Sequence, residues 1–286
     1  MSRMRVALLV PAPDFPEPFA WAYDVEAAIL RQIGIEVEAV AWTELDDVTG
    51  FDLILPLVAW GYNRDYPRWL AFLDRAEAER WPMLNPPSLL RWNGDKRYLR
   101  ELGTRGIPTV TTVEVDALDA ASLSGAAAKL GAMDLVVKPP VSGGAFGTYR
   151  LRADDPIPED VAGQRMMIQT YQPTITEGEW SILLFGGKFS HAVLKTPARG
   201  DFRVQPFHGG SDQYAVAPGG AVKLAMAALA AAPAPALYAR VDMIAAANGE
   251  LKIMEMELIE PALFLHHAPD KGVAFASAVR SAAARK

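Results

Sequence analysis

Continuous apolar runs and helical repeats alternate along the first 84 residues. Residues 4–10 and 51–57 are almost entirely apolar, which is typical of strands buried in a parallel sheet. Residues 35–42 alternate between apolar and polar positions as a strand does, whereas 19–32 and 66–80 have helical character. This order predicts a small α/β domain with a largely parallel sheet over residues 1–84.

The pattern changes at Asn85-Pro86-Pro87, where a second set of elements begins. Ser88 is a suitable helix cap, so we expect a helix that runs through Leu102, and a second helix at 118–130. An interdomain hinge is expected near residues 169–174. Short strands are predicted at 108–115, 134–138, 149–152 and 166–171.

The remaining sequence contains two turn signals, Gly186-Gly187 and Asn248-Gly249. Each lies between two predicted strands. Between them, residues 196–220 form a long loop rich in Gly, Pro and His. We therefore divide the chain into three units, residues 1–84, 85–168 and 169–286. The elements predicted in the last unit are strands at 179–185, 188–195, 237–246 and 250–259 and helices at 221–232 and 270–284.

The composition excludes some classes of site chemistry and argues against some classes of binding partner. The 286 residues are 51% apolar with a formal net charge of −6, which is typical of a folded protein and argues against a non-specific nucleic-acid binder. The absence of cysteine excludes disulfides, thiolate catalysis and cysteine-ligated metal sites. The apolar stretch 224–239 is interrupted by two prolines, and 6–10 is too short for a secretory signal. We expect a cytoplasmic protein without membrane or nucleic-acid partners.

The turn at Asn248-Gly249 predicts which side chains share a face of its hairpin. A two-residue loop there places Asp242 opposite Glu255 and Arg240 opposite Glu257, all on one face. Opposed carboxylates repel, and a Mg²⁺ ion with oxygen ligands would offset that repulsion. The alternative is a solvated face that Arg240 partly neutralises, and a three-residue loop would reverse the faces. The apolar face would consist of Val241, Met243, Met254, Met256 and Leu258.

A glycine-rich loop, residues 142–148 (SGGAFGT), lies between two predicted strands and follows Lys138. It is not a Walker A loop, because no Gly-Lys-Ser/Thr follows, nor a dinucleotide fingerprint, which requires strand–turn–helix. A flexible flap of this kind can fold over phosphates through its free N–H groups. A lysine at the end of an apolar strand, as Lys138 is, is rarely buried without a partner. An ordinary hairpin loop is the alternative.

The order of these motifs resembles the ATP-grasp superfamily. The resemblance covers about residues 85–265, in the segments DK, DLVVKPPVSGGAFGT, IQTYQP, EGEWSILLF and RVDM…KIMEMELIEP. It extends to glutathione-synthetase-like enzymes and, through the tail MEMELIEPALFL, to the O-ureidoserine cyclo-ligase (cycloserine synthetase) group. It implies an α/β fold in which an N-terminal parallel α/β domain precedes a two-subdomain ATP-grasp module.

The resemblance also implies a role for each matching residue. Asp242, Glu255 and Glu257 would bind Mg²⁺ or Mn²⁺. Most superfamily ligases have Glu-x-Asn where this chain has Glu-Met-Glu, so the added charge leaves open whether one or two ions bind. The ATP-binding set comprises two lysines, the phosphate flap, an adenine-binding hinge and a ribose-binding glutamate. Its members would be Lys96, Lys138, Ser142, Gly143, Gly144, Gln169, Thr170, Tyr171 and Glu179.

The implied activity is ATP-dependent ligation of a carboxylate to an amine or hydroxylamine through an acyl phosphate, with cycloserine-type cyclisation as one form of it. Such chemistry depends on positioning and charge neutralisation. Arg203 and Arg240 are candidates for stabilising the transferring phosphoryl group, because arginine presents a planar fork to oxyanions. Arg199 and Lys195 are secondary candidates, with a solvated basic loop as the alternative.

Acceptor contacts are expected at the carboxyl ends of the N-terminal strands and in the long loop 196–220. For the aromatic candidates the alternative is packing between domains, and for His208 it is a surface or capping role. His266 and His267 lack metal-ligand spacing, so no metal is assigned to them. The acceptor candidates are Tyr23, Asp24, Trp60, Tyr62, Asn63, Arg199 and His208.

Two other functions are consistent with the same motifs. One is an ATP-dependent phosphotransferase without ligation, and the other is a non-catalytic nucleotide-binding module. The expected partners are small-molecule carboxylate and amine-type substrates. Superfamily members are often homo-oligomers, but the sequence identifies neither the oligomeric state nor the acceptor.

Overall fold

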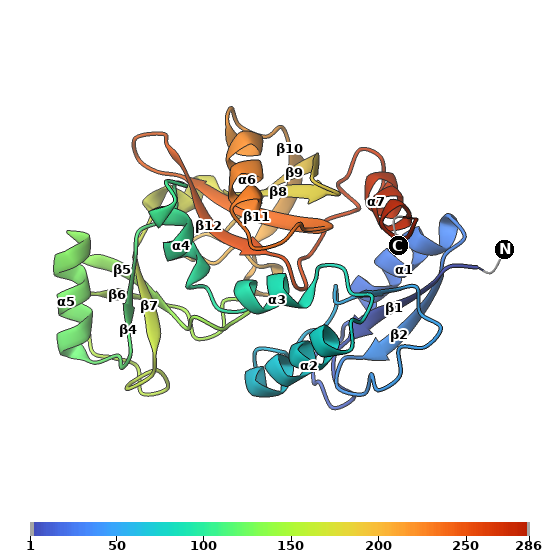
Figure 1. Ribbon diagram of the computed structural model, residues 1–286. Helices are drawn as coiled ribbons and strands as arrows, with labels where there is room; N and C mark the ends of the chain where they lie inside the picture. The colour runs from blue at the N-terminus through green and yellow to red at the C-terminus, as the bar shows by residue number, and fades with distance from the viewer. Residues whose placement is uncertain (1–2, 285–286) are drawn as a thin grey trace.

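The fold, taken from a computed structural model, is described for residues 3–284 and contains three sheets. A three-stranded sheet lies to the right in Figure 1, a five-stranded sheet in the centre and a four-stranded sheet to the left. The mixture of helices with parallel and antiparallel sheets confirms the predicted α/β fold class. No helix within the described residues is both long enough and apolar enough to cross a membrane.

The first sheet is parallel, as predicted, with strand order β2-β1-β3. Its central strand is fully enclosed, since Val6, Ala7, Leu8 and Leu9 have no exposed surface. Asp65 caps the second helix by accepting a 3.3 Å hydrogen bond from the Arg68 N–H. The elements are β1 (Arg5–Val10), α1 (Ala20–Gln32), β2 (Glu36–Ala41), β3 (Leu53–Leu55) and α2 (Tyr66–Ala78).

The four-stranded sheet has the order β4-β7-β5-β6 and is antiparallel. Helix α5 packs on it through Leu123 and Ala127 and ends at Gly131, which has a φ of 63°. Strand β7 continues to Thr170, two residues past the predicted unit boundary at 168; that boundary stays a prediction. The elements are β4 (Thr112–Val115), α5 (Ala120–Leu130), β5 (Asp134–Lys138), β6 (Tyr149–Arg152) and β7 (Met166–Thr170).

The five-stranded sheet is antiparallel, with the order β10-β9-β8-β11-β12. Strand β10 lies inside the stretch 196–220 that was expected to be a loop, and that part of the expectation is wrong. Its sequence SDQYA lacks an apolar repeat, because β10 is an edge strand held by backbone bonds to β9. The elements are η1 (Pro173–Glu177), β8 (Glu179–Phe185), β9 (Lys188–Thr196), η2 (Pro206–His208), β10 (Ser211–Ala215), α6 (Ala221–Ala230), β11 (Tyr238–Ala245) and β12 (Leu251–Glu257).

The single helix expected from Ser88 to Leu102 is instead two short helices, α3 (Pro87–Asn93) and α4 (Tyr98–Thr104). The break between them contains Asp95 and Lys96, and the Lys96 N–H donates a 2.9 Å bond to the Pro140 carbonyl. Both helices pack against the five-stranded sheet through a shared apolar core. The interruption therefore brings the lysine to the strand that leads into the glycine loop.

The hairpin of β11 and β12 departs from the prediction in one detail and agrees in its outcome. Ala246 pairs with Glu250, so the loop has three residues rather than two. A bulge at Met254 adds one residue to β12 and restores the predicted pairs, Asp242 with Glu255 and Arg240 with Glu257. Met254 is displaced from the predicted apolar face by this bulge, and the other four members of that face are buried.

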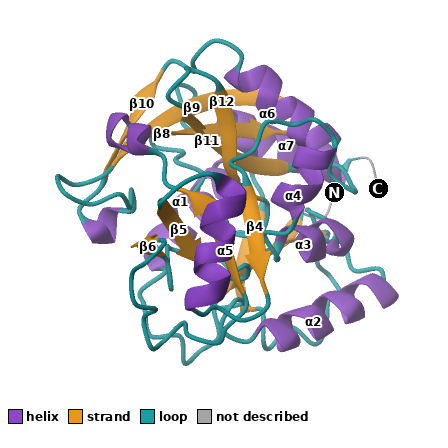
Figure 2. Ribbon diagram, turned by 90° about the vertical axis from the view of Figure 1, so that its left-hand side faces the viewer, coloured by secondary structure: helices purple, strands orange, loops and turns teal. Residues whose placement is uncertain are grey.

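The C-terminal helix α7 (Val273–Ala283) lies beside α1 in Figure 1. Phe275 and Val279 share one apolar core with Val6 and Leu8 of β1 and with Phe185 of β8. The first and last segments of the chain are thus packed together. Figure 2 shows α5 in front of the four-stranded sheet, with the five-stranded sheet above it.

Candidate functional site

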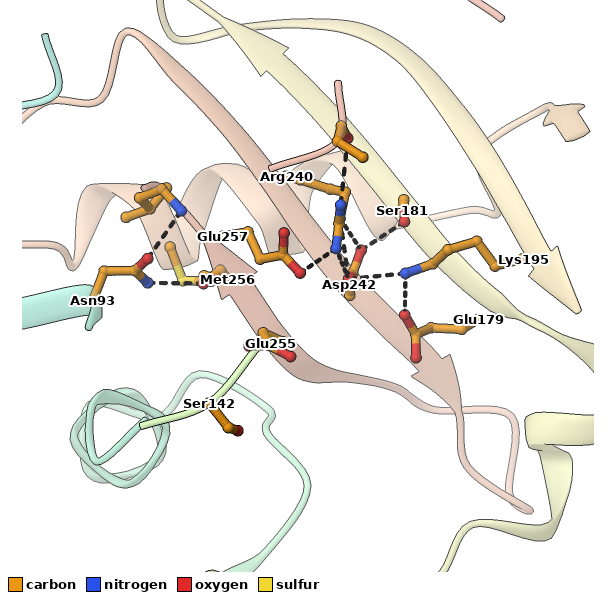
Figure 3. A network of polar contacts seen from close by, with 12 residues as sticks. Asn93, Ser142, Glu179, Ser181, Lys195, Arg240, Asp242, Glu255, Met256 and Glu257 are labelled. Carbon is orange, nitrogen blue, oxygen red and sulfur yellow. Dashed lines mark hydrogen bonds and ion pairs between the residues drawn. The ribbon is translucent and has the colours of Figure 1, made fainter. Parts of the chain in front are cut away.

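One face of the five-stranded sheet carries a band of alternating charges. Residues directly opposed on paired strands share a face, and the pairs Glu179–Lys195, Asp242–Glu255 and Arg240–Glu257 all belong to this face. Figure 3 shows the side chains of this band and their polar contacts. Each carboxylate of the band lies next to a cation, so repulsion between neighbouring acids is offset.

Asp242 is the most enclosed member of the band, with 3% of its surface exposed. Its carboxylate accepts hydrogen bonds from Ser181 Oγ at 2.6 Å, from Lys195 Nζ at 2.9 Å and from Arg240 Nε at 3.1 Å. Burial alone would raise its pKa, but Arg240 and Lys195 outweigh burial and hold the pKa well below its usual range. Asp242 is therefore ionised at neutral pH.

Arg240 links Asp242 to Glu257, with ion pairs to both carboxylates. It also donates a 3.3 Å bond to the Ala262 carbonyl and lies over the Phe264 ring. Burial, with a contribution from Glu255, raises the pKa of Glu257 to about 7 although Arg240 opposes the shift. Glu257 consequently changes charge close to neutral pH in this arrangement.

Glu255 faces the second unit of the chain, residues 85–168. Lys96 Nζ lies 3.2 Å from Glu255 Oε1 and donates a 2.6 Å hydrogen bond to the Ser142 carbonyl. These contacts connect the carboxylate strand, the break between α3 and α4, and the start of the glycine loop. Glu179, at the other end of the band, is buried and ion-paired with Lys195, and burial raises its pKa.

The position of the carboxylate strand is fixed by side chains that bind its outer edge. Asn93 donates to the Met256 carbonyl at 2.8 Å and accepts from the Leu258 N–H at 2.9 Å. The Tyr98 hydroxyl bonds both the N–H and the carbonyl of Met256. An edge strand normally leaves these groups unpaired, so α3 and α4 hold Glu255 and Glu257 in place.

Lys138 ends β5, the strand that leads into the glycine loop, and is 9% exposed. Burial lowers its pKa, with Glu255 the largest opposing influence. In the described part of the chain its ammonium group has no hydrogen bond or ion pair, unlike Lys96 and Lys195. A buried, unpaired cation at the start of a glycine loop fits a phosphate group better than it fits an apolar core.

Next to the band is a small apolar cluster. Val110, Ile175, Val204 and Ile244 are buried there. Half-buried Tyr171, Phe202 and the bulged Met254 pack against them.

The predicted adenine-binding hinge borders this cluster. Gln169 and Thr170 are strand residues of β7, and the Gln169 amide donates a 2.8 Å bond to the Thr112 hydroxyl. The Tyr171 N–H is already bonded to the Asp134 carbonyl at 2.9 Å. Backbone recognition of adenine would therefore use the neighbouring groups of this segment, and the hinge role stays a prediction.

The chemistry of Asp242, Glu255 and Glu257 suits Mg²⁺ or Mn²⁺, because all three supply hard oxygen ligands. Their oxygens are nevertheless not gathered within 4.8 Å of one another as a set in the described chain. Arg240 binds Asp242 and Glu257 instead, and Lys96 binds Glu255. Metal binding would therefore require these cations to give up part of their present contacts.

The cations predicted in the long loop are not brought into the band. The Arg203 guanidinium binds Asp201, with its shortest contact at 2.8 Å, and Arg199 is exposed. His208 lies against the ring of exposed Phe207. Phe207 in turn is 3.2 Å from where a Cβ of Gly144 would lie, so this loop touches the glycine flap. The roles of Arg203, Arg199 and His208 stay predictions.

Among the acceptor candidates of the first unit, only Tyr62 is linked to the carboxylates. It is buried with its ring tilted against that of Trp69, and its pKa is raised by burial and then by Glu260, Glu255 and Glu257. Trp60 packs with Phe15 and Trp21, and Asn63 is half-buried. The Tyr23 hydroxyl accepts a bond from Arg31, and Asp24 is exposed.

Sequence reasoning missed two polar groups near the band. Glu260, just after β12, is half-buried, and burial together with Glu257 raises its pKa to about 8. Asp212 of β10 pairs opposite Lys195 and approaches His266 and His267, with 2.5 Å between His267 Nε2 and Asp212 Oδ1. The sequence carried no signal for either, because both depend on elements that come together only in the fold.

Comparisons with known proteins identify the family of the chain. Residues 6–85 match the family "D-cycloserine synthetase DcsG, N-terminal domain". The chain is 31% identical to the cycloserine biosynthesis protein DcsG of Streptomyces lavendulae, over 96% of this chain and 97% of that protein. It is 29% identical to a glutathione synthetase of Ralstonia nicotianae over 57% of this chain and 51% of that enzyme.

Solved structures extend the likeness to the whole fold. The crystal structure of D-cycloserine synthetase DcsG has a TM-score of 0.79 and 26% identity, and 98% of this chain and 99% of that chain are covered. A Bacillus anthracis D-alanine–D-alanine ligase solved with ATP has a TM-score of 0.69 at 17% identity, covering 100% and 98%, which shows the fold alone. The predicted ATP-grasp fold is confirmed. The chain belongs to the cycloserine synthetase group of ATP-grasp ligases.

Proposed function

We propose that this ATP-dependent ligase activates the carboxylate of a small amino-acid-like substrate as an acyl phosphate and then joins it to a nitrogen nucleophile. Cycloserine-type ring closure, in which the nitrogen belongs to the same molecule, is the form favoured by the full-length similarity to DcsG. The reaction transfers the γ-phosphoryl group of ATP to the carboxylate oxygen. That transfer leaves ADP. The nitrogen then attacks the acyl carbon and displaces phosphate.

In this proposal the band and the groups around it have separate roles. Lys138 and Lys96 bind the phosphates under the flap formed by Ser142, Gly143 and Gly144, and Glu179 orients the ribose. The apolar cluster beside Tyr171 receives adenine. Asp242, Glu255 and Glu257 hold Mg²⁺, which neutralises the phosphate charge when bound. Arg240, released from Glu257, stabilises the transferring phosphoryl group.

The observation that supports this function most is the unpaired ammonium group of Lys138. The other buried cations near the site each have a carboxylate partner in the described chain, with Lys195 on Asp242, Arg240 on Asp242 and Glu257, and Lys96 on Glu255. Among these cations Lys138 is left to bind an external anion, and it ends the strand that leads into the glycine flap. A degenerate nucleotide-binding module would not need to retain the full set of carboxylates beside it.

Trapping with hydroxylamine tests the acyl phosphate directly. The protein is incubated with ATP, Mg²⁺ and O-ureidoserine, and products are followed by mass spectrometry with and without hydroxylamine. We expect ADP, phosphate and a cyclised product, and a hydroxamate when hydroxylamine is present. A stable phosphorylated product that hydroxylamine does not intercept would contradict ligation and support the phosphotransferase alternative.

A further inference from the structure

Two adjacent histidines and an aspartate meet beside β10, the edge strand of the five-stranded sheet. His267 Nε2 lies 2.5 Å from Asp212 Oδ1, and His266 Nε2 lies 3.6 Å from the same oxygen. One ligand atom from each of the three residues lies within 4.8 Å of the other two. No second set of three His, Asp or Glu side chains is gathered in this way within residues 3–284, so the cluster is separate from the carboxylates of the charged band.

The carboxylate of Asp212 is not neutralised by the cation opposite it. Asp212 pairs across the strands with Lys195, but Lys195 Nζ contacts Asp242 and Glu179. The ion-pair partners of Asp212 in the described chain are the two histidines. The His266 side chain is 64% exposed and its ring makes no hydrogen bond in that part of the chain, so its Nε2 is accessible to a ligand from solvent.

The backbone turn that carries the two histidines directs both rings to the same place. Side chains of neighbouring residues on an extended chain point to opposite sides. Here Phe264 has a φ of 48°, its carbonyl accepts a 2.9 Å bond from the His267 N–H, and the two imidazole rings lie 4.1 Å apart. Leu265 and Ala268, on either side of the pair, are buried and anchor the segment to the protein interior. The convergence is therefore set by the fold.

The three ligand atoms have nearly the spacing that a tetrahedral metal ion requires. Bonds of about 2.0–2.1 Å from the metal to nitrogen and oxygen place two ligand atoms about 3.3 Å apart. The distances of 2.5 and 3.6 Å lie on either side of this value, so shifts of about 1 Å or less complete the geometry. Imidazole nitrogen and carboxylate oxygen together suit Zn²⁺, whereas Mg²⁺ prefers oxygen ligands.

We propose that Asp212, His266 and His267 bind a divalent transition-metal ion such as Zn²⁺, with water in the remaining position. This site is independent of the ligase function proposed above and of the Mg²⁺ that binds with ATP. The ion links the edge strand β10 to the segment that precedes α7. It thereby holds the end of the loop whose Phe207 touches the glycine flap.

Titration of Zn²⁺ against a competing fluorescent chelator tests the site, in excess Mg²⁺ so that sites made of oxygen ligands are occupied. Wild type should bind one equivalent of Zn²⁺. His266→Gln and His267→Gln should each bind it at least about 10-fold more weakly, because each loses a direct ligand. Co²⁺ in place of Zn²⁺ should give wild type the visible absorption of four-coordinate Co²⁺, and both variants should lose it.

Two controls should bind Zn²⁺ as wild type does: His208→Gln, which removes a histidine elsewhere, and Glu255→Ala, which removes a carboxylate of the band. Zn²⁺ at about 100 times its dissociation constant should raise the Tm of wild type by roughly 5–10 °C and leave that of His266→Gln unchanged. Because His266 is exposed, this variant should have the wild-type Tm after metal is removed by a chelator.

Equal Zn²⁺ affinity in wild type and in both histidine variants would place the ion elsewhere and overturn the assignment. Failure of wild type to bind Zn²⁺, or loss of Zn²⁺ binding in Glu255→Ala, would overturn it as well. None of these results bears on the ligase function, which the hydroxylamine experiment tests separately.

Discussion

Arg240 connects the two carboxylates on which the charged band depends. It is buried, and its guanidinium group is shared between Asp242 and Glu257. Lys195 makes the corresponding link between Asp242 and Glu179. Because each cation serves two acids, removal of one central acid leaves buried positive charge uncompensated. We therefore expect substitution of Asp242 to have a large effect on the free energy of unfolding.

Replacing Asp242 with Asn leaves Arg240 and Lys195 close together without the charge between them. We expect a loss of about 3–5 kcal/mol in the free energy of unfolding, as for other broken buried ion pairs. Turnover should also be abolished while residual ADP binding remains. Urea titration measures the first effect and ADP release the second. An Asp242→Asn protein as stable and active as wild type would rule out the role given to Asp242.

The raised pKa of Glu257 predicts a pH dependence whose sign can be worked out. Its pKa is about 7 in the folded protein, above the ordinary value near 4.3. Glu257 therefore contributes stability that is fully present below about pH 4.3 and is lost as the pH rises through about 7. Mg²⁺ requires the ionised form, so binding should release protons and strengthen as the pH rises from about 6 to 8.

Calorimetric titration of Mg²⁺ in the presence of ADP, repeated in buffers with different ionisation enthalpies, measures that proton release. Glu257→Gln should bind the metal weakly and without the same pH dependence. Metal affinity in wild type that does not vary between these pH values would show that Glu257 is not the titrating ligand.

At the scale of the elements, contacts at the outer edge of β12 determine where Glu255 and Glu257, the proposed metal ligands, lie. Asn93 of α3 and Tyr98, the first residue of α4, bind backbone groups on either side of Glu257. The Asn85 side chain likewise bonds the carbonyls of Tyr238 and Leu258. The short helices therefore act as a clamp on the strand that carries Glu255 and Glu257, as well as part of the apolar core.

Asn93→Ala should weaken this clamp. The substitution leaves the buried Leu258 N–H without its partner, at a cost of about 1–3 kcal/mol, and leaves the Tyr98 hydroxyl as the remaining partner of the Met256 carbonyl. Urea unfolding should show a loss of this size, and Mg²⁺ affinity should fall because Glu257 is no longer held. Gln164→Ala, which removes one exposed hydrogen bond, is the control. Unchanged metal affinity in a destabilised Asn93→Ala would separate the clamp from the site.

The β11–β12 hairpin shows which features of an element can be predicted from the sequence. Its predicted pairing of Asp242 with Glu255 is confirmed, but by a three-residue loop and a compensating bulge at Met254. Turn residues in the sequence indicate that a hairpin exists, whereas a bulge is set by packing against other elements. The same limit explains β10 and the interrupted helix, since Lys96 is placed by a contact with Pro140 that is remote in sequence.

The identities of the site residues were easier to predict than their present partners. The lysines, the carboxylates and the flap could be named from motif order, and the roles of these residues stay predictions. The ion pair of Arg203 with Asp201, and the meeting of Asp212 with two histidines, could not be foreseen. Which cation pairs with which acid depends on distances between strands, and a linear pattern does not contain those distances.

At the scale of the whole molecule, the site lies between units that are held together by different cores. The first sheet and α7 share one core with β8, and α5 packs on the four-stranded sheet through another. The glycine flap and the loop that carries Phe207 meet across the band and expose large aromatic rings. Phe146 is 75% exposed and Phe207 69% exposed. Such exposed rings at a site are suited to become covered when ligands bind.

Chymotrypsin, which cleaves after aromatic residues, tests that closure. Cleavage after Phe146 and Phe207 should slow several-fold in the presence of Mg²⁺ and ADP, because the flap orders over the nucleotide. Cleavage at Trp21, which is 61% exposed on α1, serves as an internal control and should not change. Equal protection at all three positions would indicate general stabilisation rather than closure of the flap.

Thermal unfolding with ADP, with and without Mg²⁺, tests the nucleotide–metal site most directly. At about 100 times its dissociation constant the ligand should add about 2.7 kcal/mol of stability, which corresponds to an increase of roughly 5–10 °C in Tm. The increase should require Mg²⁺ and should be absent in Glu255→Ala. An unchanged Tm with every adenine nucleotide, with or without Mg²⁺, would contradict the assignment of the charged band as an ATP site.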